Sequence, residues 1–212
     1  MLGFTSDFRN PESSSAAPRS VSLHAYVSSR ILHTAAAGTR PAAGPTGSEE
    51  ANGVVGICAA ATLLDGVVLA LTPDHHSCNY RSAVVFGRAH MVTDEAEPLW
   101  AMERVTDDLI PGRWAATRYL NAAEPRSTGI LRVDVGSASA KIRTRSTGEA
   151  PSDLNDEDIR QRVREGVVPA HLVWGEPMVA PTNTTDEVPR YIDERMTEET
   201  EEANGYAYHV TK

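Results

Sequence analysis

Along this chain of 212 residues, stretches in which polar and apolar residues alternate are separated by runs rich in Gly, Pro and Ser. Residues 20–25 (Ser-Val-Ser-Leu-His-Ala) alternate with a period of two, which is typical of a strand with one buried face, and residues 129–135 repeat the pattern. Two apolar runs, 53–64 and 67–71, are separated by Asp65-Gly66. Because Asp-Gly between apolar runs is typical of a two-residue turn, this segment predicts a β-hairpin. The alternative is a strand that enters a buried loop.

Residues 75–91 predict one long strand. Polar side chains crowd residues 75–82, and the β-branched and aromatic run Val84-Val85-Phe86 follows them. Gly87 interrupts this run, and a glycine inside a strand usually marks a bulge or a close approach of another backbone. We therefore expect the first half of the strand to face a site and the second half to lie within a sheet.

Three helices and one further strand are predicted. A short helix begins near Ser28, since a serine can cap the free N–H groups of a first turn. A second helix begins at residues 93–95, whose acidic side chains suit the helix dipole, and ends before Pro111-Gly112. Residues 154–164 predict a charged helix and residues 167–174 predict the last strand.

The remaining segments are polar. Residues 1–19 are rich in Ser and Pro and predict a loop or disordered N-terminus, and residues 39–52 predict a surface loop. Beyond residue 182 the chain is acidic and poor in large apolar groups, which predicts a disordered tail, with a docked terminal helix as the alternative. The sequence thus predicts one domain, residues 20–181, between a polar N-terminus of residues 1–19 and a tail of residues 182–212.

Composition excludes several classes of protein. A formal net charge of −9 and a pI of about 5.2 argue against a nucleic-acid partner, because phosphate binding needs basic surfaces. No apolar run is long enough to span a membrane and no secretory signal is visible, so we expect a cytoplasmic protein with no membrane partner. Cys58 and Cys78 are then expected to be reduced thiols. Neither a G-x-G-x-x-G nor a P-loop sequence is present, and no G-x-S-x-G or H-E-x-x-H motif appears.

The junction between the first predicted strand and the helix after it has the composition of an anion site. His24 precedes Ser28 and Ser29, whose hydroxyls stand at a helix start with free N–H groups, and Arg30 adds a bidentate donor. This combination suits a phosphate dianion. An ordinary helix cap beside a surface arginine has the same sequence, so spacing alone leaves both interpretations open.

The polar segment 75–82 offers several chemistries. Tyr80 is able to stack or to donate a hydrogen bond, and Arg81 places a positive charge beside any anionic group. His75 and His76 are metal-ligand types, but no third ligand stands at a suitable spacing, so no metal is predicted. A solvated loop that leads into a strand is the alternative.

Residues 137–143, Ser-Ala-Ser-Ala-Lys-Ile-Arg, form a third candidate segment. Lys141 and Arg143 are placed to contact a cofactor or an acidic substrate, and a solvated basic corner explains them equally well.

The run Asn79-Tyr80-Arg81-Ser82, followed by Val84-Val85-Phe86-Gly87-Arg88-Ala89, resembles the signature strand of the pyridoxamine 5′-phosphate oxidase-like, FMN-binding split-barrel proteins. The nearest branch is that of the nitroimidazole-resistance and flavin-nucleotide-binding proteins. Residues 62–66, Thr-Leu-Leu-Asp-Gly, are also similar, and the resemblance covers about residues 23–173. The family has a glycine after its Lys-x-Arg-Thr turn, where this chain has Arg145.

This resemblance implies a mainly β fold with a few helices, an FMN-binding split β-barrel of six antiparallel strands. It implies FMN as the cofactor and a homodimer with flavin at the interface. In the family, the His-x-x-x-x-Ser-Arg element holds the flavin phosphate and the signature strand lies beside the flavin ring. The cofactor-binding residues implied are His24, Ser28, Ser29, Arg30, Tyr80, Arg81, Ser82, Lys141 and Arg143.

Two functions are consistent with this resemblance. The first is an FMN-dependent oxidoreductase that acts on a small molecule, and no catalytic residue is assigned because the flavin supplies the redox chemistry. The second is a non-catalytic flavin-binding or interaction protein that keeps the fold without turnover. Since the family's first helix and strands are not recognisable before His24, we also expect the barrel to be incomplete at its N-terminus.

Overall fold

The computed structural model describes residues 2–5, 8, 20–26, 28–37, 54–94, 96–121, 124 and 128–211. They form two compact units, each made of segments that are distant in the sequence. Unit 1 comprises Met1–Ala59 and Val84–Ala138, and unit 2 comprises Ala60–Ala83 and Ser139–Lys212. The predicted loop over residues 39–52 lies outside the described residues.

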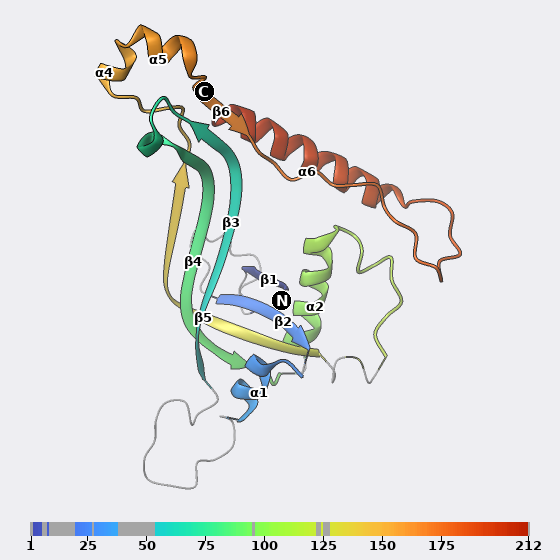
Figure 1. Cartoon of the computed structure of the whole chain (residues 1–212). Coiled ribbons are helices and arrows are strands. Elements are labelled where there is room, and N and C mark those ends of the chain that lie inside the picture. Colours follow the sequence, from blue (N-terminus) through green and yellow to red (C-terminus); the bar gives the residue numbers. More distant parts are fainter. Residues whose placement is uncertain are drawn as a thin grey trace, which may run out of the picture. The chain divides into compact units, whose positions relative to one another are not determined.

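The described strands belong to one six-stranded sheet with the order β1-β2-β5-β4-β3-β6 (Figure 1). Their bounds are β1 Leu2–Thr5, β2 Ser20–Tyr26, β3 Val55–Leu69, β4 Ser77–Met91, β5 Thr128–Arg143 and β6 Gly166–Pro169. Strand β2 pairs antiparallel with both β1 and β5, and β6 pairs antiparallel with β3.

The helices are few and mostly short. They are α1 Arg30–Ala37, the 3₁₀ turn η2 Pro73–His75, α2 Ala96–Leu109, α4 Pro151–Leu154, α5 Glu157–Arg162 and α6 Arg190–His209. A mainly β chain with a six-stranded antiparallel sheet and few helices confirms the predicted split-barrel fold class.

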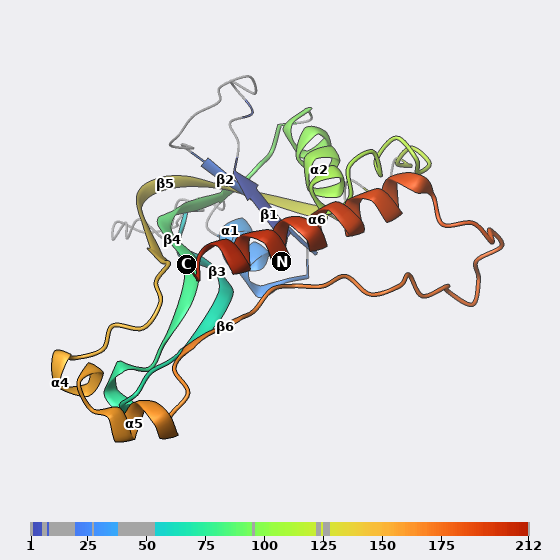
Figure 2. The ribbon, with the colours of Figure 1, turned by 90° about the horizontal axis from the view of Figure 1, so that it is seen from above.

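In unit 1, the sheet is covered by α1 on one face and α2 on the other. Strand β5 shows why, because its neighbouring residues point to opposite faces. Ile130 packs against α2 in a cluster with Ala101, whereas Leu131 packs against α1 in a cluster with Leu32. Figure 2 shows α2 beside β1 and β2, which it contacts.

Helix α2 begins and ends where the sequence predicted. The Asp94 carboxylate accepts hydrogen bonds from the backbone N–H groups of Ala96 (2.7 Å) and Glu97 (3.1 Å), which caps the first turn. Gly112, with a φ of +79°, follows its C-terminus. A left-handed backbone at this position favours glycine over other residues.

Gly87 of β4 is a close-approach site. A Cβ added here would collide with the backbone carbonyl of Asp134 and would lie 2.6 Å from Cγ1 of Val133, both on β5. The prediction that Gly87 marks a close backbone approach is therefore confirmed.

In unit 2, Asp65-Gly66 is not a turn. Strand β3 runs through both residues, and the predicted hairpin is wrong. Gly66 pairs with Pro169 of β6, and a Cβ at Gly66 would meet the carbonyl oxygen of Val168 at 3.1 Å. Asp65 is 3% exposed, and the bond from Arg81 to its carboxylate offsets the cost of burying the charge. Partners distant in sequence therefore override the local turn preference.

The acidic C-terminal segment contains a helix, so the disordered tail predicted beyond residue 182 is wrong for Arg190–His209. Apolar residues at helical spacing, Ile192, Met196, Ala203 and Ala207, lie on its less exposed side, and Ala207 is fully buried. The alternative of a docked helix describes this segment better. The domain boundaries at residues 19–20 and 181–182 stay predictions.

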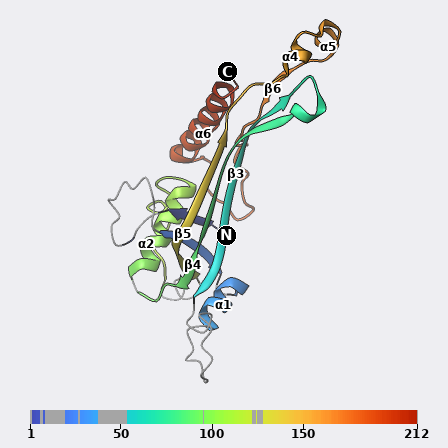
Figure 3. The ribbon, with the colours of Figure 1, turned by 90° about the vertical axis from the view of Figure 1, so that its left-hand side faces the viewer.

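Several local expectations also need correction. Residues 2–5 form β1 rather than a loop, because they pair with β2. Residues 137–143 continue strand β5, and the last strand is only Gly166–Pro169. The predicted helix over 154–164 is instead divided between α4 and α5, which lie near the β3–β4 turn in Figures 1 and 3. Within the described part of the chain, none of the helices has the length and apolar character needed to cross a membrane.

Candidate functional site

The first candidate site is the junction of β2 and α1 in unit 1. The backbone N–H of Ser29 donates to the Tyr26 carbonyl (2.8 Å), which makes a tight turn between the strand and the helix. The Ser29 carbonyl in turn accepts from the N–H of His33 (3.1 Å), so Ser29 occupies the N-cap position of α1. The helix predicted to begin near Ser28 therefore begins at Arg30.

The hydroxyl of Ser29 is a buried polar group without a hydrogen-bond partner among the described residues. A buried polar atom without a partner costs free energy, so its presence at a helix N-terminus calls for an explanation. Ser28 and Arg30 beside it are exposed, and the first N–H groups of α1 add positive partial charge. The junction can therefore bind a phosphate-like anion.

His24 lies on β2, two residues before the strand ends. It is half-buried, stands opposite Ile130 of β5 in the strand register, and its pKa is lowered mainly by that burial. A lowered pKa keeps the imidazole neutral to lower pH than in water, so at neutral pH its ring is a hydrogen-bonding group rather than a charge.

The second candidate site is in unit 2 and is centred on Arg81. The guanidinium donates to both carboxylate oxygens of Asp65, from Nε at 3.1 Å and from Nη2 at 2.8 Å. It also lies 3.8 Å from the centre of the Tyr206 ring on α6. The hydrogen bond to Asp65 is the main reason that the pKa of Arg81 is raised. Arg81 is thus already paired within the protein.

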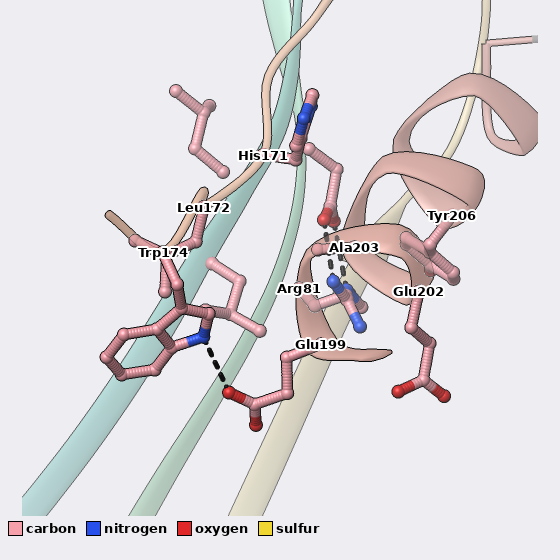
Figure 4. Close-up of a pocket in the computed structure, with 11 residues that line it drawn as sticks. Arg81, His171, Leu172, Trp174, Glu199, Glu202, Ala203 and Tyr206 are labelled. Atoms are coloured by element: carbon pink, nitrogen blue, oxygen red, sulfur yellow. Dashed lines mark hydrogen bonds and ion pairs between the residues drawn. The ribbon is translucent and has the colours of Figure 1, made fainter. Parts of the chain in front are cut away.

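A pocket of about 370 Å³ opens next to this pair, as Figure 4 shows. Its apolar and aromatic lining comes from β3, from residues 171–174 and from α6. The Trp174 indole N–H donates to the Glu199 carboxylate at 2.7 Å, and Glu202 extends from the same helix. The residues that line the pocket are Leu63, Leu64, Asp65, Arg81, His171, Leu172, Trp174, Glu199, Glu202, Ala203 and Tyr206.

The chemistry of this pocket favours a small ligand with an apolar body and a donor or cationic group. Among the lining residues, Arg81 is paired with Asp65 and Glu199 is paired with Arg195, whereas the exposed Glu202 adds negative charge. An anion would therefore meet net repulsion there.

The other predicted cofactor residues of unit 2 make contacts among themselves. The Lys141 ammonium lies 5.7 Å from the centre of the Tyr80 ring, and hydrogen bonding with Tyr80 is the main cause of its raised pKa. The Ser82 hydroxyl donates to the Lys141 carbonyl at 3.3 Å. These three residues are brought together by the neighbouring strands β4 and β5.

Arg143 is instead tied to Asn79, which the sequence did not single out as a site residue. The Asn79 carbonyl oxygen accepts from Arg143 Nη1 (2.8 Å) and from the Arg145 N–H (3.1 Å). Its amide donates to the carbonyls of Arg145 (2.9 Å) and Val210 (3.4 Å), and the side chain is fully buried. Asn79 is thus a structural bridge between β4, the segment after β5 and the end of α6.

The predicted site residues therefore fall into two groups. His24, Ser28, Ser29 and Arg30 belong to unit 1, and Tyr80, Arg81, Ser82, Lys141 and Arg143 belong to unit 2. Sequence reasoning missed Asp65, which it assigned to a turn, because its partner Arg81 lies 16 residues away.

The sheet and its few helices place this protein in the class of split β-barrels. The chain belongs to the pyridoxamine 5′-phosphate oxidase family, whose sequence model matches residues 20–142. The family resemblance carried by the signature strand is thereby confirmed. No curated protein matches the chain in sequence.

Three solved structures are similar to it. The flavocytochrome Anf3 from Azotobacter vinelandii is 26% identical with a TM-score of 0.66, over 83% of this chain and 72% of that one. The FAD and heme binding protein from Mycobacterium smegmatis is 24% identical with a TM-score of 0.67, over 85% and 78% respectively, and shows the shared fold. A putative 5-nitroimidazole antibiotic resistance protein from Bacteroides thetaiotaomicron is 14% identical, with a TM-score of 0.38 over 58% and 61%. No argument rests on this third similarity.

Proposed function

We propose that this chain binds a flavin nucleotide, FMN, through the β2–α1 junction and acts as an FMN-dependent oxidoreductase on a small molecule. The observation that carries the proposal is the buried, unpartnered Ser29 hydroxyl at the N-terminus of α1, in a chain of this family. A phosphate oxygen would provide the missing hydrogen-bond acceptor.

The remaining groups at the junction suit the same ligand. The first backbone N–H groups of α1 point out of the helix end and attract an anion. Arg30, which is exposed, would add a charge-assisted hydrogen bond. Ser28 offers a second hydroxyl, and His24 presents a neutral imidazole on the strand that leads into the turn.

A bound flavin would supply hydride and electron transfer, and the chain would supply binding and orientation. From the family resemblance alone, we also propose that Tyr80, Ser82 and Lys141 of unit 2 are polar groups that contact the cofactor or substrate. Arg81 and Arg143 play a lesser part, because their guanidinium groups already bind Asp65 and Asn79.

The test is the absorption spectrum of the purified protein, followed by release and identification of any chromophore. Titration with FMN, FAD and riboflavin then reports which nucleotide is bound. We expect FMN to bind more tightly than riboflavin, because only the nucleotide carries the phosphate. Equal affinity for both, or no binding of either, would refute the phosphate site.

Turnover is a separate question, answered by steady-state assays with NAD(P)H and artificial acceptors. Flavin that is reduced and reoxidised rapidly supports an oxidoreductase. Flavin that stays oxidised over many minutes supports the non-catalytic flavin-binding protein.

A second candidate is a protein that binds both a flavin and haem. It is favoured by the similarity to the Azotobacter vinelandii protein, which is described as a flavocytochrome. The test is a Soret absorption band after expression with a haem precursor, together with a pyridine haemochrome assay. A spectrum with flavin bands alone would remove this candidate.

We also propose that the chain forms a homodimer, the assembly that its family resemblance implies. Large apolar side chains of unit 1 exposed to solvent, such as Tyr26 (74%) and Phe86 (53%), give a partner apolar surface to cover.

A further inference from the structure

One cluster of metal-ligand side chains in unit 2 is not used by the proposed flavin site. It consists of His75 at the end of η2, Glu149 in the segment after β5, and Asp153 in α4. One ligand atom of each lies within 4.8 Å of the others. The sequence analysis named His75 as a metal-ligand type but found no further ligand near it, because 74 residues separate His75 from Glu149.

Glu149 is the unusual member of the cluster. Its side chain is 1% exposed, yet among the described residues neither a lysine nor an arginine forms an ion pair with it. Its contacts are the Leu71 N–H, which donates to Oε1 at 2.9 Å, and His75 Nδ1, which lies 3.4 Å from Oε2. A buried carboxylate normally pairs with a cation or coordinates a metal, because an isolated buried charge is costly.

The distances fit a shared cation better than a direct hydrogen bond. The 3.4 Å between His75 Nδ1 and Glu149 Oε2 exceeds the usual N–H···O range. Two ligands that each lie about 2.0–2.1 Å from a tetrahedral metal are about 3.3 Å apart. The Leu71 N–H fixes the other Glu149 oxygen, which leaves Oε2 directed toward His75.

The other ring nitrogen of His75, Nε2, lies 3.8 Å from the exposed Asp74 carboxylate, which is too far for a direct hydrogen bond but adds negative charge beside the ring.

We propose that His75, Glu149 and Asp153 bind a divalent first-row transition cation, of which Zn²⁺ is the best representative. An imidazole nitrogen with two carboxylates disfavours Mg²⁺ and Ca²⁺, which take oxygen ligands. Three protein ligands leave one coordination position of the metal open for water or another ligand. The cation would also connect the β3–β4 turn to the segment between β5 and α4, and it does not depend on flavin binding.

The experiment is a zinc titration of the tag-free, full-length protein after treatment with a chelator. Zinc affinity is measured by competition with a chromophoric chelator, and the melting temperature is followed in the same samples. We expect one zinc ion per chain and a melting temperature that rises with zinc concentration. Cobalt substitution should give visible d–d absorption bands that are characteristic of a nitrogen- and oxygen-ligated site.

The variants His75→Gln and Asp153→Asn should each weaken zinc binding by about tenfold or more and abolish the rise in melting temperature. Matched controls are His76→Gln, whose ring binds the Thr72 carbonyl (2.9 Å), and Asp158→Asn, which is exposed. Both controls should bind zinc as the natural chain does. Because Asp153 is only half-buried, its variant is expected to fold even if a change at buried Glu149 does not.

Three results would overturn the proposal. One is the absence of zinc binding at micromolar concentrations, which would leave a proton between His75 and Glu149. Another is equal zinc affinity in the natural chain and in both site variants. The third is loss of a haem absorption band in His75→Gln with unchanged zinc affinity in Asp153→Asn, which would assign His75 to haem.

Discussion

Single residues decide the polar chemistry of unit 2, and the pair Asp65–Arg81 shows how. The Asp65 side chain is 4% exposed and the Arg81 side chain is 35% exposed, so the carboxylate is buried while its partner reaches solvent. A buried carboxylate is stable only while it is paired, which makes the arginine necessary to the fold whether or not it contacts a ligand.

We predict that Arg81→Met destabilises the protein by about 1–3 kcal/mol. Breaking a buried pair costs about 3–5 kcal/mol, and the partial exposure of Arg81 reduces that value. The measurement is urea unfolding, with Arg190→Met as the control, because Arg190 pairs with Glu194 on the exposed side of α6 and should change stability by less than about 0.5 kcal/mol. If Arg81→Met is as stable as the control, the pair has no structural role.

Arg30 is the residue whose proposed role is to bind a ligand. We predict that Arg30→Ala weakens FMN binding by about 1.5–3 kcal/mol, the range of a charge-assisted hydrogen bond, and leaves riboflavin binding nearly unchanged. Isothermal titration with both ligands measures the difference. Equal losses for FMN and riboflavin would show that Arg30 acts on the fold or the flavin ring rather than on the phosphate.

At the scale of whole elements, close approaches between the backbones of the long strands restrict which residues fit at particular positions. Gly87 of β4 lies against β5, where an added methyl group would collide with the Asp134 carbonyl. A backbone atom within a paired sheet has little room to move, so the collision cannot be relieved by a change of rotamer.

We predict that Gly87→Ala destabilises the protein by about 1–3 kcal/mol, as expected for an overpacked core site. Gly56 of β3 is a matched control, because a Cβ there meets no atom within 4 Å and its φ is not positive. Gly56→Ala should be neutral or stabilising by up to about 1 kcal/mol, since alanine reduces the entropy of the unfolded chain. Thermal unfolding of both variants tests this prediction. A Gly87→Ala protein with the same melting temperature as the natural protein would contradict it.

On the scale of the whole molecule, the main question is assembly. We predict a homodimer in the presence of flavin, in keeping with the family resemblance and with the apolar side chains that unit 1 exposes. Light scattering at micromolar concentration measures the mass. A flavin-bound protein with the mass of one 22.9 kDa chain would contradict the prediction.

The sequence by itself determined the elements whose signals are local. The two-residue period of Ser20–Tyr26 predicts β2, and the acidic, helix-capping residues around position 94 predict the start of α2. The run Asn79 to Ala89 predicts the long strand β4 and identifies the family. The helix over residues 190–209 also had a local signal, namely Ile192, Met196, Ala203 and Ala207 at helical spacing. Its acidic composition obscured that signal.

Only the tertiary structure decided which residues became partners. Asp65-Gly66 has the sequence of a turn, but Gly66 pairs with β6 and Asp65 binds Arg81, so the strand continues. Glu149, in the segment between β5 and α4, meets His75 of η2 in the same way. Hydrophobic periodicity and secondary-structure propensity depend on neighbouring residues in the sequence. The free energy of a buried charge depends instead on the group that the fold places next to it. No local pattern identifies that group. The phosphate-like site was predicted because its residues lie in one short segment, whereas the candidate metal site joins segments that are distant in the sequence.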